Sequence, residues 1–422
     1  MSGELTLIAT PHRRVYPAMD IAQQAYILLE ITPSANAPAA QNQPVNVCLV
    51  LDRSGSMSGE KLNAMKQAAR LVVDQLGAQD LLSVVIFDDA QPAELVVPGA
   101  PVIDRQAIQR KIEAIEERGG THMSTGMRLG LQELQRGRSP ERVSSMILLT
   151  DGQTWEDQQE CRDLADQCRA AGVSIQAFGL GVGAENNWDP RLLEELAQRS
   201  GGEWMPVESP DQVSAAFQKT LCAIQGAVVA NANLTMRMVS GVTPRAVWRT
   251  APLISRLDHH AVGTNDIQVF LGEIRQGTGQ ALLADLLLPP RAAGIYRLIQ
   301  ADVTYDVPGS GLKGQRAAID VTLDFVNDAT QTGQVDERIM NLIEKVVAHR
   351  LQTQALDDAA AGNASRATQR LRAAATRLLE LGEVELARQA DQQADLIEKG
   401  GHLDPAAAQK MRYATKRLTE IE

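Results

Sequence analysis

The chain has 422 residues, of which 44% are hydrophobic and 22% are charged. At roughly 150 residues per domain this length predicts about three domains, and the composition excludes collagen-like, disulfide-rich and wholly disordered proteins. Acidic residues outnumber basic residues by 52 to 41, and the net charge of -11 excludes a protein that binds nucleic-acid phosphates without regard to sequence.

The first 44 residues contain two strand-like runs, at 4–10 and 22–33, which are too few to bury a core alone. They lack a basic segment followed by a long apolar stretch, so we expect no signal peptide and a cytoplasmic location. The longest apolar runs of the chain fall far short of the roughly 20 residues that span a bilayer, so we expect no membrane segment.

Residues 45–225 alternate short apolar runs with amphipathic helical stretches, a pattern typical of βα units and a mainly parallel sheet. Six strands and about six helices fit a doubly wound sheet. The run at 93–102 contains prolines, which predicts an edge strand. Cys161 and Cys168 lie two helical turns apart, and we interpret them as packed thiols of a reducing compartment.

Residues 226–330 show partial alternation of apolar and polar residues, with Gly, Pro and Asn turns, which predicts an antiparallel sheet. We expect the strands of residues 1–44 to join it, because the ends of a domain usually lie close together. The α/β domain at 45–225 would then be inserted into a β-sandwich. The pair His259-His260 lies between strand-like segments and is expected at the surface.

Residues 335–422 are helical in pattern, with glycines where helix C-caps are expected. The spacing of Leu371, Ala375, Leu378 and Leu379 predicts one apolar face with arginines opposite. The favoured interpretation is a helical bundle, and a helix-repeat peptide groove is the alternative. The mixed charge of these helices favours protein contact or self-association over membrane binding.

Polar residues follow two of the predicted strands and one loop, where the carboxyl ends of strands in open α/β sheets form ligand sites. The first strand of the α/β domain ends in Asp52-Arg53-Ser54-Gly55-Ser56, a later one ends in Thr150-Asp151-Gly152, and Gly119-Gly120-Thr121 precedes a helix. We expect these segments to place two carboxylates and three hydroxyls together. The candidate metal-site residues are Asp52, Ser54, Ser56, Thr121 and Asp151.

Two carboxylates in such a cleft repel each other unless a cation lies between them, and oxygen ligands suit a hard cation. We therefore expect Mg²⁺, with Mn²⁺ or Ca²⁺ as alternatives. Ser54, Ser56 and Thr121 would supply the inner shell, with Asp52 and Asp151 hydrogen-bonded to bound waters or hydroxyls. Neutral hydroxyl ligands leave most of the positive charge of the metal unneutralised, so the cation would bind the carboxylate of an Asp or Glu from a partner.

The three motifs, in this order, resemble the metal-ion-dependent adhesion site of von Willebrand factor A domains. The resemblance covers residues 45–225 and implies strand order 3-2-1-4-5-6, a bound divalent metal and a protein ligand whose acidic side chain completes the coordination. His122 stands where Asn is frequent in the family. The expected architecture is an α/β, doubly wound Rossmann-like domain inserted in a β-sandwich and followed by a C-terminal helical bundle.

Two other functions compete with a metal-dependent, non-catalytic binding module in an intracellular assembly or signalling system. A Mg²⁺-dependent phosphohydrolase of the haloacid-dehalogenase type would use Asp52 as its nucleophile, but Ser54 occupies the place of an acid and no later Lys with paired acids follows. A scaffold would instead act through its C-terminal helices, with the metal site incidental.

Overall fold

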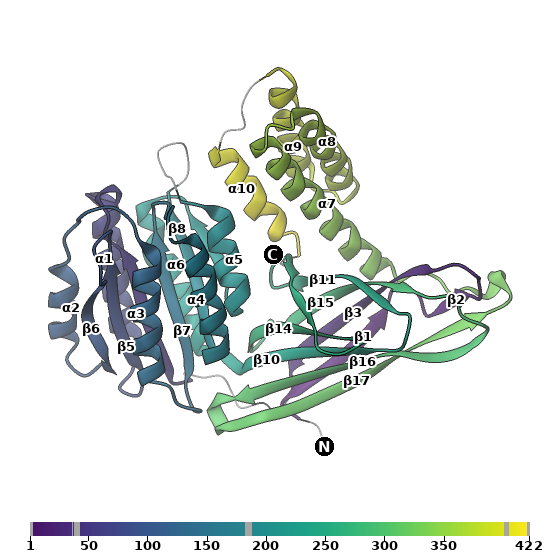
Figure 1. Ribbon diagram of the computed structural model, residues 1–422, viewed down its shortest axis with the longest axis horizontal. Helices are drawn as coiled ribbons and strands as arrows, with labels where there is room; N and C mark the ends of the chain where they lie inside the picture. The colour runs from purple at the N-terminus through teal and green to yellow at the C-terminus, as the bar shows by residue number, and fades with distance from the viewer. Residues whose placement is uncertain (1–2, 36, 38–42, 182–187, 401–404, 420–422) are drawn as a thin grey trace.

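The computed structural model describes residues 3–35, 37, 43–181, 188–400 and 405–419. Figure 1 shows an α/β domain at one end, two long β-sheets at the other, and a group of helices above the region where these two parts meet. No helix within these residues is long and apolar enough to cross a membrane.

The α/β domain is built on a six-stranded sheet in the order β6-β5-β4-β7-β8-β9, parallel except for the antiparallel edge strand β6. This is the order 3-2-1-4-5-6 that the resemblance implies. Every residue of β4, β7 and β8 is buried, because helices cover both faces of the sheet. The strands are β4 (Val45–Asp52), β5 (Leu81–Phe87), β6 (Glu94–Pro101), β7 (Val143–Thr150), β8 (Val173–Leu180) and β9 (Trp204–Val207).

One face of this sheet packs against α1, α2 and α6, and the other packs against α3, α4 and α5. Asp189 caps α5 by accepting hydrogen bonds from two backbone amides, and Gly201 ends it at a φ of 78°. Cys161 and Cys168 are buried in α4, as expected. The helices are α1 (Glu60–Gln75), α2 (Arg105–Glu113), α3 (Met123–Arg136), α4 (Gln158–Ala171), α5 (Pro190–Ser200) and α6 (Val213–Gln225).

Strands from both sides of the α/β domain form a β-sandwich, so the prediction of an inserted domain is confirmed. One sheet has the order β1-β3-β15-β11-β12 and the other β13-β14-β10-β16-β17-β2, with a shared aliphatic core between them. The strands are β1 (Leu5–Pro11), β2 (Val15–Pro17), β3 (Gln23–Pro33), β10 (Ala227–Met238), β11 (Thr243–Ala251), β12 (Ser255–Leu257), β13 (His259–Ala261), β14 (Asp266–Arg275), β15 (Gln280–Leu288), β16 (Gly294–Val307) and β17 (Leu312–Val326).

The C-terminal helices pack on the outer face of the β1-β3-β15-β11 sheet, where Leu28, Trp248 and Leu283 join their core. Leu371, Ala375 and Leu378 are buried as predicted, but Leu379 is 52% exposed, so its place on the apolar face was wrong. A helix turns about 100° per residue, which carries Leu379 away from the buried side. The helices are α7 (Glu337–Ala360), α8 (Ala364–Glu380), α9 (Val384–Glu398) and α10 (Pro405–Lys416).

The last helix, α10, contacts both α7 and the α/β domain. Lys416 and Arg412 are buried, and both form ion pairs with Glu194 of α5. The Lys416 ammonium also lies 4.9 Å from the centroid of the Trp204 ring of β9. Because buried charges require such partners, this cluster fixes α10 against the α/β domain.

Candidate metal centre

Asp52 is the last residue of β4, and its carboxylate is fully buried at the carboxyl edge of the sheet. Its Oδ1 accepts a hydrogen bond of 2.8 Å from the Ser54 backbone N–H, and its Oδ2 accepts one of 2.6 Å from the Thr150 hydroxyl. Thr150 ends the neighbouring strand β7. Asp52 therefore shapes its own turn and joins the two strand ends.

A line of hydrogen bonds leads from this turn to the second carboxylate. The Ser54 and Ser56 Oγ atoms lie 3.0 Å apart, and the Ser56 hydroxyl donates to Asp151 Oδ1 at 2.6 Å. Asp151 comes directly after β7 and is buried. The two serines and the two carboxylates predicted from the sequence thus meet at one edge of the sheet.

Thr121 reaches the same place from the loop before α3. A Cβ on Gly152 would lie 2.9 Å from Thr121 Oγ1 and 3.8 Å from Ser56 Oγ, so only a glycine leaves room for this hydroxyl. The Gly55 N–H also donates to the Gly119 carbonyl at 2.9 Å, which ties this loop to the serine turn. All five candidate residues lie together, while their role as metal ligands stays a prediction.

Lys61, which the sequence did not single out, completes the group from the first turn of α1. Its Nζ donates to Asp151 Oδ2 at 2.5 Å, and its side chain is 25% exposed while that of Asp151 is fully buried. The ammonium is thus an internal cation on one of the two carboxylates. A lysine early in an amphipathic helix is common, so no sequence signal marked this one.

The electrostatics of the site favour a cation. Burial raises the pKa of the Asp52 carboxyl to about 6, although hydrogen bonds from Thr150 and Ser54 favour its ionised form. The nearby Asp151 carboxylate raises that pKa further. In the part of the chain that the structure describes, no three His, Cys, Asp or Glu side chains are grouped to hold a metal. A metal here would depend on hydroxyl oxygens, which suit Mg²⁺.

Asp88 organises the loops around the site. Its Oδ2 accepts from Arg53 Nε at 2.8 Å and from Arg118 Nε at 3.1 Å, and its carbonyl accepts from the His122 N–H at 3.0 Å. Burial opposes ionisation, but the Ala90 N–H and these two guanidinium groups outweigh it and lower the pKa of Asp88. The buried Asp88 carboxylate and carbonyl thus connect the serine turn to the loop before α3.

Trp155, in the loop that follows Asp151, is 76% exposed, whereas Trp188, Trp204 and Trp248 are buried. It lies four residues after Asp151, in the loop between β7 and α4. Asp157 holds this loop by accepting from the Ser124 N–H at 2.6 Å. The motif that marked this strand end stops at Gly152, so the sequence did not single out Trp155.

The phosphohydrolase alternative is not favoured by this geometry. A nucleophilic aspartate needs a carboxylate oxygen that a substrate can reach. Asp52 is fully buried, and both of its oxygens already accept hydrogen bonds. Its position fits a structural carboxylate that orients the serine turn.

Comparisons with known proteins match the α/β domain and the C-terminal helices to two family models. Residues 46–219 match the family model described as von Willebrand factor type A domain, and residues 337–421 match Sll0103-like, C-terminal alpha-helical domain. Uncharacterized protein sll0103 of Synechocystis sp. is 30% identical over 272 residues, which cover 64% of this chain and 63% of that protein. Human inter-alpha-trypsin inhibitor heavy chain H3 is 30% identical over 167 residues, 38% of this chain and 18% of that one.

The match thus covers less than two thirds of the length of either relative. Among solved structures, von Willebrand factor type A from Catenulispora acidiphila has a TM-score of 0.80 at 16% identity, over 98% of this chain and 96% of that one. At this identity the likeness shows the fold alone, but it extends over the whole architecture. Residues 46–219 of this chain are a von Willebrand factor type A domain, and a C-terminal helical domain follows the sandwich.

Proposed function

We propose that this chain is a non-catalytic, divalent-metal-dependent module that binds an acidic side chain of a protein partner. Ser54, Ser56 and Thr121 would contact Mg²⁺, while Asp52 and Asp151 would orient those hydroxyls and balance the charge. Bound Mg²⁺ would supply an electrophilic position for an Asp or Glu carboxylate. The observation that carries the proposal is the hydrogen-bonded line from Asp52 through the two serines to Asp151.

The fit of these residues to a cation follows from their chemistry. Two carboxylates are buried side by side in one network, and only Asp151 has a basic side chain within ion-pair distance among the described residues. Buried carboxylates without a counter-charge are costly, so a divalent ion would stabilise this edge of the sheet. Ser56 is exposed, which leaves the site open to a partner.

Trp155 gives the partner an apolar anchor beside the charge. Exposed tryptophans next to a polar centre often dominate binding free energy, because they bury a large rigid surface on contact. The proposed partner segment therefore presents a carboxylate to the metal and an apolar surface to Trp155. A general protein-interaction role agrees with the von Willebrand factor type A domain, and cytoplasmic action in an assembly or signalling system is part of the proposal.

The first experiment measures Mn²⁺ and Mg²⁺ binding to the full chain by calorimetry. Replacing Ser54 and Ser56 together by Ala should weaken the affinity at least ~10-fold, as loss of ordered ligand-shell groups does elsewhere. Ser58→Ala, an exposed serine in the same loop, is the control and should bind normally. Equal affinities for all three proteins would disprove the metal site.

The second experiment tests the partner. Capture from native lysate should require Mg²⁺ and fail in chelator, and Trp155→Ala should lose the captured protein while retaining normal Mn²⁺ affinity. Capture that is unchanged by chelator and by the double serine variant would show that binding uses another surface, such as the C-terminal helices.

A further inference from the structure

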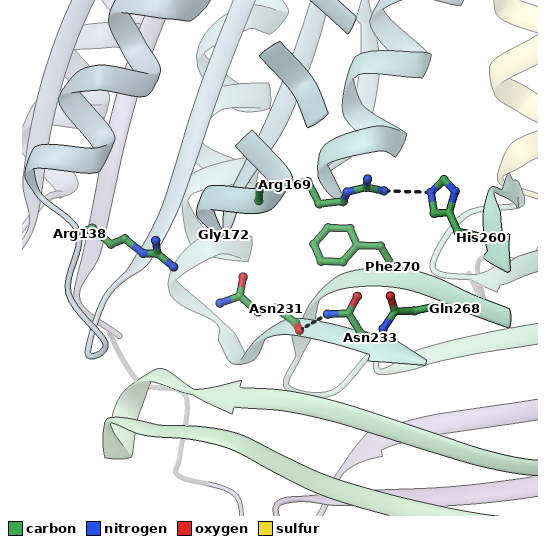
Figure 2. Close-up of a pocket in the computed structure, with 9 residues that line it drawn as sticks. Arg138, Arg169, Gly172, Asn231, Asn233, His260, Gln268 and Phe270 are labelled. Carbon is green, nitrogen blue, oxygen red and sulfur yellow. Dashed lines mark hydrogen bonds between the residues drawn. The ribbon is translucent and has the colours of Figure 1, made fainter. Parts of the chain in front are cut away.

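A hollow of about 340 Å³ lies between the α/β domain and the β-sandwich, at the edge of the sheet opposite the candidate metal centre. Figure 2 shows Arg138 and Arg169 on either side of Gly172, with the Arg169 guanidinium turned toward His260. Both arginines belong to the α/β domain, and residues of β10, β13 and β14 line the hollow from the sandwich. Arg138 follows α3 and Arg169 lies in the last turn of α4. The hollow is large enough for a small organic ligand.

The charge of this hollow is positive, in contrast to the net charge of -11 of the chain. No carboxylate is among its lining residues in the described part of the chain. The structure shows no ion pair for Arg138 within those residues, and the nearest carboxylate oxygen to Arg169, on Asp166, is 3.9 Å away. Asp166 is itself paired with Arg199 at 2.9 Å. Two guanidinium groups therefore keep most of their capacity to bind an anion.

His260 adds to this side of the hollow. Its Nε2 lies 3.4 Å from Arg169 Nη1. The dashed line in Figure 2 marks this contact. A guanidinium can only donate, so His260 accepts through Nε2 and carries its proton on Nδ1. The contact orients the Arg169 side chain without neutralising its charge.

The sandwich side of the hollow has a fixed and unusual backbone. Asn231 has a φ of 53°, the one non-glycine residue in the left-handed region among those described. Its Nδ2 donates to Asp306 at 2.8 Å, and Asn233 donates to its carbonyl at 2.9 Å. A Cβ on Gly172 would lie 2.6 Å from Asn231 Oδ1, so the two domains touch closely here. Backbone strain of this kind persists where surrounding contacts hold it, often at binding sites.

A second hollow of about 390 Å³ shares Arg138, Gly172 and Asn231 with the first and adds Arg142 and Lys313. Its single carboxylate among the described lining residues, Asp306, already accepts hydrogen bonds from Asn231 and from the Gly314 N–H at 2.9 Å. The two hollows thus lie next to each other, on either side of the contact between Gly172 and Asn231, and both are lined by basic side chains. We refer to the pair as the basic cleft.

We propose that this cleft binds a small phosphorylated ligand with more than one anionic group, held by Arg138 and Arg169. Guanidinium groups match phosphate oxygens in pairs, and the half-buried Phe270 ring offers an apolar surface for the organic part. Because its lining comes from both domains, the ligand would fasten the α/β domain to the sandwich. The proposal is independent of the metal centre.

The test is calorimetry and thermal unfolding of the full chain in EDTA, with pyrophosphate, adenosine diphosphate and succinate as probes. Binding of pyrophosphate or the nucleotide, with a raised unfolding temperature, is expected. The double variant Arg138→Gln, Arg169→Gln should lose at least tenfold in affinity. The control variant Arg70→Gln, Arg110→Gln removes two exposed charges of the same domain far from the cleft and should bind normally.

If adenosine diphosphate binds more tightly than pyrophosphate, its organic part contributes to the affinity, as contact with Phe270 would. If the two affinities are equal, the phosphate groups alone account for binding. Both results support the proposal. Three results would overturn it: no binding of either phosphate at millimolar concentration, succinate binding as tightly as they do, or equal affinity in the cleft variant and the native chain.

Discussion

Replacing Lys61 by Met should tighten metal binding at the candidate centre. The Lys61 ammonium contacts Asp151 Oδ2 at 2.5 Å, so a metal that uses this carboxylate must displace it or bind beside it. Methionine keeps most of the length of the side chain and removes the charge. Both the competition for Asp151 and the repulsion of the incoming cation then disappear.

The size of the effect follows from the contact that is lost. A hydrogen bond between charged groups contributes about 1.5–3 kcal/mol, and partial exposure of Lys61 favours the lower half of that range. Since about 1.4 kcal/mol corresponds to tenfold in affinity, the dissociation constant for Mn²⁺ should fall roughly 10- to 30-fold. The assay is a calorimetric titration of the full chain with Mn²⁺.

The free energy of unfolding of Lys61→Met gives an independent test of the same contact. Without metal, Lys61→Met leaves the buried Asp151 without its cation and should lower the free energy of unfolding by about 1–3 kcal/mol. Saturating Mn²⁺ should restore it. Lys66→Met is the matched control on α1, because that ammonium contacts the Glu113 carbonyl at 2.9 Å and not the site. Weaker or unchanged Mn²⁺ affinity in Lys61→Met would refute the competition.

Two further predictions concern stability. Burial lowers the pKa of His349 from 6.5 to about 3, with Lys416 and Arg412 lowering it and Glu194 raising it, so the folded chain keeps this imidazole neutral. In the unfolded chain this imidazole takes up a proton below pH 6.5. Lowering the pH from 7.5 to 5.5 should therefore reduce the free energy of unfolding by roughly 1.4 kcal/mol. Urea unfolding of His349→Gln should lack that part of the pH dependence. In β8, a Cβ at Gly179 would lie 2.3 Å from the buried Trp188 ring, so Gly179→Ala should lose roughly 1–3 kcal/mol in the same assay. Gly263→Ala, whose Cβ meets only ordinary contacts at 3.4 Å, should change little, and equal stability of the two variants would contradict the packing argument.

The sequence predicted the elements whose side chains follow a clear period. The continuous apolar runs of β4 and β7 marked buried parallel strands, and the polar residues after them marked the edge where a site would lie. The strand β11 is hard to recognise from the sequence, because its arginines break the alternation of apolar and polar residues. One of them, Arg249, is buried and donates to the Leu271 carbonyl at 3.1 Å. Burial of a charged residue is decided by a distant partner, which a local pattern does not contain.

The same limit applies to the sites. Asp52, Ser54 and Ser56 are local to one turn, so their spacing was informative. Lys61 and Asp151 are 90 residues apart, and their contact exists only because α1 starts above the end of β7. The basic cleft is still less visible, because its arginines come from the loop after α3 and from the last turn of α4, and its amides come from strands of the sandwich.

The two proposed sites lie at opposite ends of β7, and we expect them to bind independently. Arg142 precedes the strand, Asp151 follows it, and all eight residues between them are buried. A shift of this strand along its axis would break its pairing with β4 and β8 and the packing on both faces, so we expect β7 to keep one arrangement whichever site is filled. Coupling between two ligands is a free energy that acts equally in both directions. Mn²⁺ affinity should therefore be the same with and without saturating pyrophosphate, and pyrophosphate affinity the same with and without Mn²⁺, after correction for Mn²⁺ binding by free pyrophosphate. A reciprocal change of fivefold or more would show that the strand, or the sandwich to which the cleft is anchored, has a second arrangement.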